Sequence, residues 1–114
     1  MPAPSNVRVL VGFLVSFEGD EVGKFWPLYQ GENQIGRIEA AEGLDIEIDH
    51  PTTSSRHAAL HAAAAPGRVW VEDLGSTNGT FIDDVRLQAR TRHELKDGGG
   101  VRFGGYSAIV KVLA

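Results

Sequence analysis

Three short polar segments carry the residue types that bind an anion and a peptide. They are Gly36-Arg37, residues 52–57 (TTSSRH) and residues 75–80 (GSTNGT). Arginine presents a rigid fork of N–H donors that matches phosphate oxygens, and serine and threonine hydroxyls add neutral hydrogen bonds. The amide of Asn78 can donate and accept at once, as binding to a peptide backbone requires, and Gly79 can adopt the positive φ of a tight loop. We therefore expect a small site for an anion and a peptide, built on loops.

Strands must position these loops, because short apolar segments with period-two alternation flank them on both sides. The predicted strands cover residues 7–17, 25–31, 33–37, 44–50, 56–65, 68–74, 79–83, 85–89, 101–105 and 107–113. Turn residues separate them at intervals of about ten residues, which is typical of a β-sandwich. Pro27 places its strand at a sheet edge or at a bulge. The sequence thus predicts an all-β fold.

Two predicted strands show a clear alternation of side chains. The first should bury one face that consists of Val7, Val9, Val11, Phe13, Val15 and Phe17. In the segment 44–50, Leu44, Ile46 and Ile48 should point inward while Asp45, Glu47 and Asp49 face the solvent.

The segment 56–65 (RHAALHAAAA) is ambiguous. Its alanines favour a helix by local propensity. However, Pro66-Gly67 ends the segment within about ten residues and the neighbouring segments have the strand pattern, so we expect a strand.

Bulk composition limits the class of protein. With 114 residues, 42% of them apolar, the chain can form one hydrophobic core. We expect a single domain over residues 7–114 after a flexible end at residues 1–6. The net charge of −4 argues against a general binder of nucleic acid or membranes, since such proteins need a broad basic field. Any anion site must therefore be local.

The absence of cysteine excludes disulfides and thiolate metal sites. The start of the chain has no basic segment typical of a signal peptide, and the apolar run at residues 9–15 is too short to span a bilayer. These features predict a cytoplasmic protein, and we expect no cofactor.

The order of the polar segments resembles the forkhead-associated (FHA) domain. The matching motifs are Gly36-Arg37, Ser54–His57 and Ser76–Thr80, and residues 94–105 (ELKDGGGVRFGG) are similar to a late strand motif of that family. The resemblance covers residues from about 34 to 113. Three motifs in order are much more specific than a single Asn-Gly, which occurs in many hairpins.

The resemblance implies an SMAD/FHA-like β-sandwich of about eleven short, mostly antiparallel strands. It also implies a non-catalytic module that binds phosphothreonine peptides. By position, Arg37, Ser54 and Thr77 would contact the phosphate, and Asn78 would bond to the main chain of the ligand.

Three other matched residues would serve the scaffold: Gly36, His57 and Gly79. The implied partner is a phosphothreonine-containing protein, such as a substrate or an autophosphorylated form of a Ser/Thr kinase. We also expect a bacterial source.

The sequence departs from the family pattern in two places. Ser55 stands where the family often has a basic or amide side chain, and Arg56 follows; we keep both as candidate ligand contacts, with Arg56 directed elsewhere as the alternative. Asp83-Asp84 stands where the family often has Asn-Gly, and it makes a poorer type I′ turn.

Other interpretations remain open from the residues alone. Arg37 could be a solvated arginine at a strand end, and Asn78-Gly79 could be a plain turn, which would leave Ser76 and Thr77 unexplained. The chain could also be a phosphate-independent assembly protein that uses its sandwich surface or an exposed edge.

Catalysis and metal binding are weaker alternatives. Ser54, His57 and Asp73 could suggest a hydrolase triad, but the nucleophile-elbow pattern is missing. His57 and His61 could suggest zinc, yet on a strand they would lie about 13 Å apart, too far for one ion. We therefore expect no metal.

Overall fold

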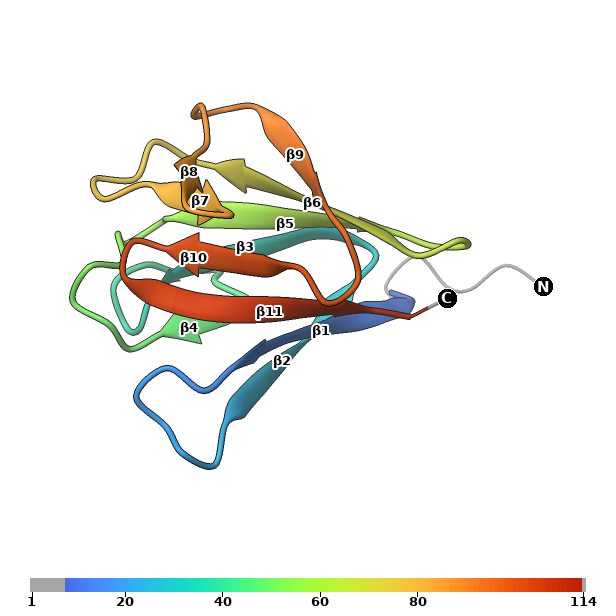
Figure 1. Cartoon of the computed structure of the whole chain (residues 1–114), viewed down its shortest axis with the longest axis horizontal. Coiled ribbons are helices and arrows are strands. Elements are labelled where there is room, and N and C mark those ends of the chain that lie inside the picture. Colours follow the sequence, from blue (N-terminus) through green and yellow to red (C-terminus); the bar gives the residue numbers. More distant parts are fainter. Residues whose placement is uncertain (1–7, 114) are drawn as a thin grey trace.

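The computed structural model describes residues 8–113, which form two β-sheets packed face to face without a helix (Figure 1). The six-stranded sheet has the order β2-β1-β11-β10-β7-β8, and the five-stranded sheet has the order β4-β3-β5-β6-β9. The strands are β1 (Leu10–Ser16), β2 (Lys24–Tyr29), β3 (Gly31–Arg37), β4 (Ile46–Ile48), β5 (Ala58–Ala63), β6 (Arg68–Asp73), β7 (Thr80–Ile82), β8 (Val85–Arg86), β9 (Arg92–Leu95), β10 (Gly100–Phe103) and β11 (Tyr106–Val112). The predicted all-β sandwich is confirmed, while the expected flexible end at residues 1–6 lies outside the described residues.

The strand pairing is mostly antiparallel, as predicted. The exception is β4, which runs parallel to β3 with Ile35 opposite Ile46. In β4, Ile46 and Ile48 are fully buried while Asp45, Glu47 and Asp49 are exposed, so the expected alternation is confirmed there. Pro27 lies on β2, an edge strand, where a missing N–H interrupts no central ladder.

The alanine-rich segment forms strand β5. It pairs with β3 on one side and with β6 on the other, so it occupies the centre of its sheet. Ala58, Ala59 and Leu60 have no exposed surface. The hydrogen bonds and burial of a central strand outweigh the helix propensity of alanine, which amounts to only about 0.7 kcal/mol per residue against ordinary residues.

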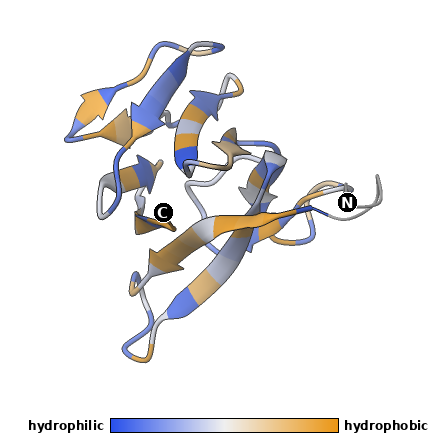
Figure 2. Ribbon diagram, turned by 90° about the vertical axis from the view of Figure 1, so that its right-hand side faces the viewer, coloured by the Kyte–Doolittle hydropathy of each residue, from blue (hydrophilic) through white to orange (hydrophobic). Residues whose placement is uncertain are grey.

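The predicted buried face of the first strand is confirmed only at Val11; Val9 is 47% exposed, and Val7 lies outside the described residues. The buried side chains are Val11, Leu14 and Ser16, whereas Phe17 is 61% exposed. A register shift between Leu10 and Gly12 inserts a bulge in the pairing with β2. The extra residue reverses the alternation of the side chains after this point. Phe13 and Val15, which belong to the predicted inner face, are therefore on the outer face of the sheet and are only partly buried. The ribbon of this strand is coloured hydrophobic along most of its length in Figure 2, and this continuous apolar run hides the phase of the alternation.

The sequence pattern did not reveal strand β9. Its residues Arg92–Leu95 are mostly polar, and only Leu95 is buried. The strand pairs with β6 at the sheet edge, where Arg68 and Glu94 form an ion pair at 3.1 Å. An edge strand with one buried side chain has too little alternation to be detected from the sequence.

The core lies between the two sheets and contains side chains from both of them. Its largest fully buried members are Phe103, Leu14, Leu28, Ile35, Ile46, Ile48, Leu60 and His57. Among the described residues, none belongs to a helix long and apolar enough to cross a membrane.

The turn between β7 and β8 has the conformation that suits glycine. Asp83 and Asp84 both have positive φ, at 50° and 62°. The carboxylate of Asp84 is 95% exposed and lies 3.8 Å from Arg102, so the ion pair adds little stability.

We therefore expect Asp84→Gly to raise the free energy of unfolding by about 0.5–1 kcal/mol, because glycine adopts this φ without strain. Urea unfolding would measure the change. Asp49→Gly is the matched control, since Asp49 is exposed but has no positive φ, and it should lower the stability. Equal effects at both positions would contradict the argument.

Candidate functional site

Three loops meet at one end of the sandwich. They follow β3, connect β4 to β5 (residues 49–57) and connect β6 to β7 (residues 74–79). In Figure 1 these loops lie at the left, opposite the end where β1 begins and β11 ends. All the site residues predicted from the sequence belong to this end of the molecule.

Arg37 is the last residue of β3. Its backbone N–H donates to the carbonyl of Ser54 (3.0 Å), and its Nη1 donates to the carbonyl of Thr53 (3.2 Å). No carboxylate of the described residues lies within ion-pair distance of this exposed guanidinium. The side chain is therefore oriented by a single bond, while most of its N–H donors stay free for an external anion.

Ser54 and Thr77 connect two of the loops. The Oγ of Ser54 accepts a hydrogen bond from the backbone N–H of Thr77 (3.1 Å). Because the serine oxygen is an acceptor in this bond, its own proton is available to a ligand. The side chain of Thr77 is exposed beside it.

Among the described residues, only the Nδ2 of the Asn78 side chain forms a hydrogen bond. Its Nδ2 donates to the carbonyl of Thr52 at 2.9 Å. No bond to Oδ1 is formed by the described residues, so this oxygen and the second Nδ2 proton can meet the N–H and C=O of an extended peptide.

The ring of His57 connects the loop 49–57 to the loop 74–79. It is fully buried; its Nδ1 accepts from the N–H of Ser54 (3.0 Å), and its Nε2 donates to the carbonyl of Gly79 (2.9 Å). The same carbonyl accepts the N–H of Gly104 (2.8 Å), so the β10–β11 turn joins the cluster. These bonds require the neutral Nε2–H tautomer, and His57 has the position of a scaffold residue.

The protonation of His57 should make the stability depend on pH. Burial lowers its pKa below the ordinary 6.5, although the bond to Gly79 and the charge of Asp73 act in the opposite direction. Below pH 6.5 the unfolded chain binds a proton that the folded chain does not, so the free energy of unfolding should fall until the folded pKa is passed. Urea unfolding at about pH 7.5 and about pH 5 would measure this decline, and His57→Gln should reduce it. A flat profile for the wild type would contradict the prediction.

Asp73 organises the loop 74–79 and was not recognised as a site-building residue from the sequence. It is 4% exposed; Oδ2 accepts from the N–H groups of Gly75 (3.0 Å) and Ser76 (3.1 Å), while Oδ1 accepts from the hydroxyls of Ser76 (2.5 Å) and Thr80 (2.7 Å). Burial alone would raise its pKa, but these hydrogen bonds outweigh burial and lower it. The available signal was the alternation of β6, which directs Asp73 inward with Val69 and Val71.

The two site glycines are needed for different reasons. A Cβ at Gly36 would collide with the backbone carbonyl of Ser55, so the close approach of β3 to the loop requires glycine. Gly79 has φ +86°, which confirms its expected positive φ.

Ser55 and Arg56 are both exposed. The Nη2 of Arg56 donates to the carbonyl of Glu42 on the loop after β3. Arg56 is thus held by a neighbouring loop, and among the described residues its guanidinium forms no hydrogen bond with Ser54 or Thr77.

The hydrolase triad and the zinc site find no geometric support among the described residues. Both ring nitrogens of His57 bond to backbone atoms, and Asp73 bonds to Ser76 and Thr80, so Ser54, His57 and Asp73 do not form a triad. His61 pairs instead with Glu72 at 2.8 Å. Within residues 8–113 no group of three or more potential ligand side chains is arranged to hold a metal ion.

Thr53 has a buried hydroxyl without a hydrogen-bond partner among the described residues. It is 1% exposed, and an unsatisfied buried hydroxyl costs stability. We therefore expect Thr53→Val to raise the free energy of unfolding by about 1 kcal/mol. Thr80→Val is the matched control, because the equally buried Thr80 donates to Asp73 and its loss should destabilise the protein. Urea unfolding of both variants would test this, and a destabilised Thr53→Val would contradict it.

Comparisons with known proteins agree with this architecture. The family model of the FHA domain matches residues 33–104, so the chain belongs to the FHA domain family. It is 39% identical to human kanadaptin over 84 residues, which are 66% of this chain and 11% of kanadaptin. It is 37% identical to mouse Smad nuclear-interacting protein 1 over 103 residues, 80% of this chain and 26% of that protein.

A solved FHA domain from a study of phosphothreonine-dependent FHA domain interactions has the same fold. It superimposes with a TM-score of 0.76 at 26% identity and covers 91% of this chain and 98% of its own. The chain therefore corresponds to a minor part of the two long relatives and to nearly the whole of this solved domain.

Proposed function

We propose that the chain is a phosphothreonine-dependent binding module that acts as a signalling adaptor. The observation that supports the proposal is the set of hydrogen bonds that joins Arg37 to Thr53 and Ser54 of the loop 49–57, and Ser54 to Thr77 of the loop 74–79. A phosphothreonine carries about −1.5 to −2 charges near neutral pH, which matches a guanidinium assisted by hydroxyls. The FHA domain similarity supports the same function.

The specificity for threonine would rest on the methyl group. One methyl packed on a protein surface contributes only about 1–3 kcal/mol, so phosphoserine should bind more weakly without being excluded. Asn78 would recognise the ligand backbone beside the phosphorylated residue and would not select a side chain.

We also propose that the module is non-catalytic. Ser54 lacks a neighbouring base, since its Oγ contacts the N–H of Thr77 while the ring of His57 is bonded to backbone atoms. A partner that is a substrate or an autophosphorylated form of a Ser/Thr kinase would suit such an adaptor, and a cytoplasmic location remains part of the proposal.

Screening a phosphothreonine peptide library, followed by calorimetry on a selected peptide, would test the function. The matched ligands are the phosphoserine and unphosphorylated forms of the same peptide. We expect the order phosphothreonine, phosphoserine, unphosphorylated. Equal affinity for the phosphorylated and unphosphorylated forms would favour phosphate-independent assembly through the exposed side chains of Phe17, Phe25 and Ile109.

A further inference from the structure

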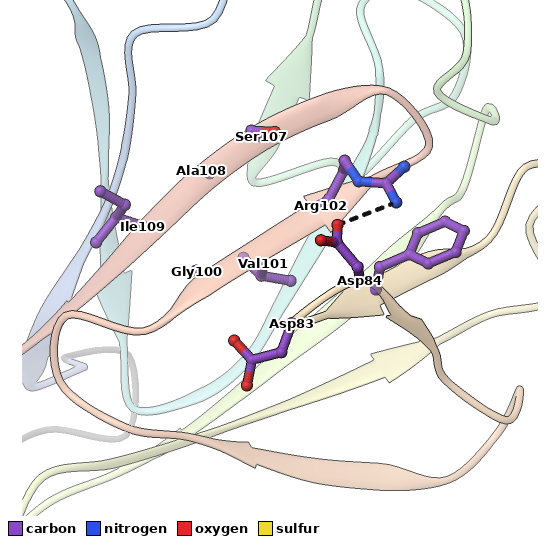
Figure 3. A pocket seen from close by; sticks show the side chains of 9 residues that line it. Asp83, Asp84, Gly100, Val101, Arg102, Ser107, Ala108 and Ile109 are labelled. Carbon is purple, nitrogen blue, oxygen red and sulfur yellow. Dashed lines mark ion pairs between the residues drawn. The ribbon is translucent and has the colours of Figure 1, made fainter.

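The outer face of the six-stranded sheet has two adjoining hollows. One, of about 310 Å³, lies between the β7–β8 turn and β11 (Figure 3). The other, of about 300 Å³, lies between the end of β1 and β11. Ser107, Ala108 and Ile109 of β11 border both hollows, which therefore form one groove; we call it the β11 groove. No residue assigned to the phosphate site lines it.

An apolar row crosses the sheet at this groove. It consists of directly opposed residues of β2, β1, β11 and β10: Phe25, Val15, Ile109 and Gly100. Residues opposed in this way share one face of a sheet. Phe25 is 67% exposed and Ile109 is 43% exposed, and large apolar side chains gathered on one exposed face typically indicate an interaction surface. At Gly100 the row is open, since a Cβ built there would meet only the carbonyl oxygen of Ala108, at 3.9 Å.

Phe17 adds an exposed aromatic ring that its neighbours keep in place. The ring fills the space beside Gly23, where a Cβ would lie 2.6 Å from a ring carbon and φ is +91°. The residues on either side of Phe17 are bonded to β11: Ser16 Oγ donates to the carbonyl of Ser107 (2.6 Å), and Glu18 Oε1 accepts from its N–H (3.3 Å). An exposed ring that is already ordered loses little entropy when a ligand packs against it.

The two ends of the β11 groove are acidic. Glu18 borders one hollow and Asp83 borders the other, and neither forms an ion pair with a described residue. Among the residues that line the groove, Arg102 is the one base. Its Nη2 already lies 3.8 Å from Asp84 (Figure 3), and its guanidinium stacks over Phe81 at 4.0 Å. The groove thus combines an apolar centre with unpaired negative charge at both ends.

This distribution of charge selects the kind of occupant. Because both ends are acidic, a second copy of the chain on a two-fold axis would set carboxylates against carboxylates whichever way the copies are turned. Lys111, which lies beside the apolar row on β11, is already paired with Asp97 at 3.3 Å. A segment with basic residues on both sides of an apolar side chain complements the apolar centre and the acidic ends together.

We propose that the β11 groove is a second docking surface, for a segment of a partner protein that carries a large apolar side chain flanked by lysine or arginine. The apolar side chain fills the hollow between Ile109 and the open position at Gly100. The flanking cations pair with Glu18 and Asp83. This surface requires no phosphate, so it extends the binding capacity of the module beyond the proposed recognition of phosphothreonine.

A display library of random, unphosphorylated peptides would test this surface. We expect the enriched peptides to carry an apolar residue with lysine or arginine on both sides. Gly100→Leu should weaken the binding of an enriched peptide, measured by calorimetry, by at least about 10-fold, because the new side chain occupies the hollow. The φ of Gly100 is not positive, so the strand can accept this residue. Gly100→Ala, which adds only the Cβ, should weaken binding less.

The contribution of charge has its own pair of variants. Asp83→Asn should weaken the same peptide by about 2- to 5-fold, and the difference should decrease at high salt. Asp49→Asn is the matched control, because Asp49 is an exposed aspartate that follows β4 of the other sheet, and it should leave the affinity unchanged. A phosphothreonine peptide should bind Gly100→Leu as it binds the wild type.

Three results would overturn the proposal. They are a library without any enriched peptide, enriched peptides that lack basic residues, and unchanged affinity of Gly100→Leu with its fold verified by urea unfolding. Sedimentation provides a further test with Ile109→Lys, which places a charge at the centre of the row. A concentration-dependent dimer of the wild type that Ile109→Lys dissociates would assign this face to a second copy of the chain instead.

Discussion

Arg37→Ala should weaken the binding of a phosphothreonine peptide by about 10- to 100-fold, because it removes charge-assisted hydrogen bonds of about 1.5–3 kcal/mol each. The guanidinium of Arg37 is exposed and has no carboxylate partner in the described part of the chain, so its loss breaks only the bond to the carbonyl of Thr53. The fold should therefore remain intact. Calorimetry would measure the affinity, and urea unfolding would verify the fold.

Two further variants sharpen this test. Arg37→Lys should recover part of the affinity, since it restores the charge without the bidentate geometry. Arg68→Ala, which removes a paired arginine from another part of the sandwich, should bind as the wild type does. If Arg37→Ala retained full affinity with its fold intact, the anion site would have to lie elsewhere.

Asp73→Ala should lower the free energy of unfolding by about 2–4 kcal/mol, the largest stability effect that we expect. The substitution removes the acceptor of the N–H groups of Gly75 and Ser76 and of the hydroxyls of Ser76 and Thr80. Buried donors without an acceptor destabilise the folded state more than the lost bonds alone would suggest. Urea unfolding would measure the change.

The same substitution should weaken peptide binding, because Thr77 and Asn78 belong to the loop that Asp73 orders. Asp49→Ala is the matched control: Asp49 is exposed beside the site loops, and its loss should change the stability by less than about 0.5 kcal/mol. A small effect of Asp73→Ala would show that the loop keeps its conformation without the carboxylate.

Most strands and the position of the site could be predicted from the sequence. Ile46 and Ile48 alternate with acidic residues, and the burial of β4 followed that alternation. The polar motifs around Arg37, Ser54 and Thr77 indicated three loops that the structure brings together. Such features are local, since each depends on residues a few positions apart along the chain.

Other features depended on contacts that local patterns do not encode. The bulge before Gly12 reversed the face of β1, because Phe13 and Val15 are as apolar as Leu14. The role of Asp73 appears only when its carboxylate is seen to accept four hydrogen bonds. Strand β9 owes its conformation to pairing with β6.

By itself, the sequence determined the all-β class, the β-strand rather than helix at Ala58–Ala63, and the loops to which we assign the anion site. Only the tertiary structure decided which arginines remain uncompensated, because ion pairs such as Arg68–Glu94 join residues that are distant in the chain. It placed Arg86 beside the carbonyl of Thr77 and bound Arg56 to the carbonyl of Glu42. The physical reason is that strand order and register set the distances between charges, and these are properties of the whole fold.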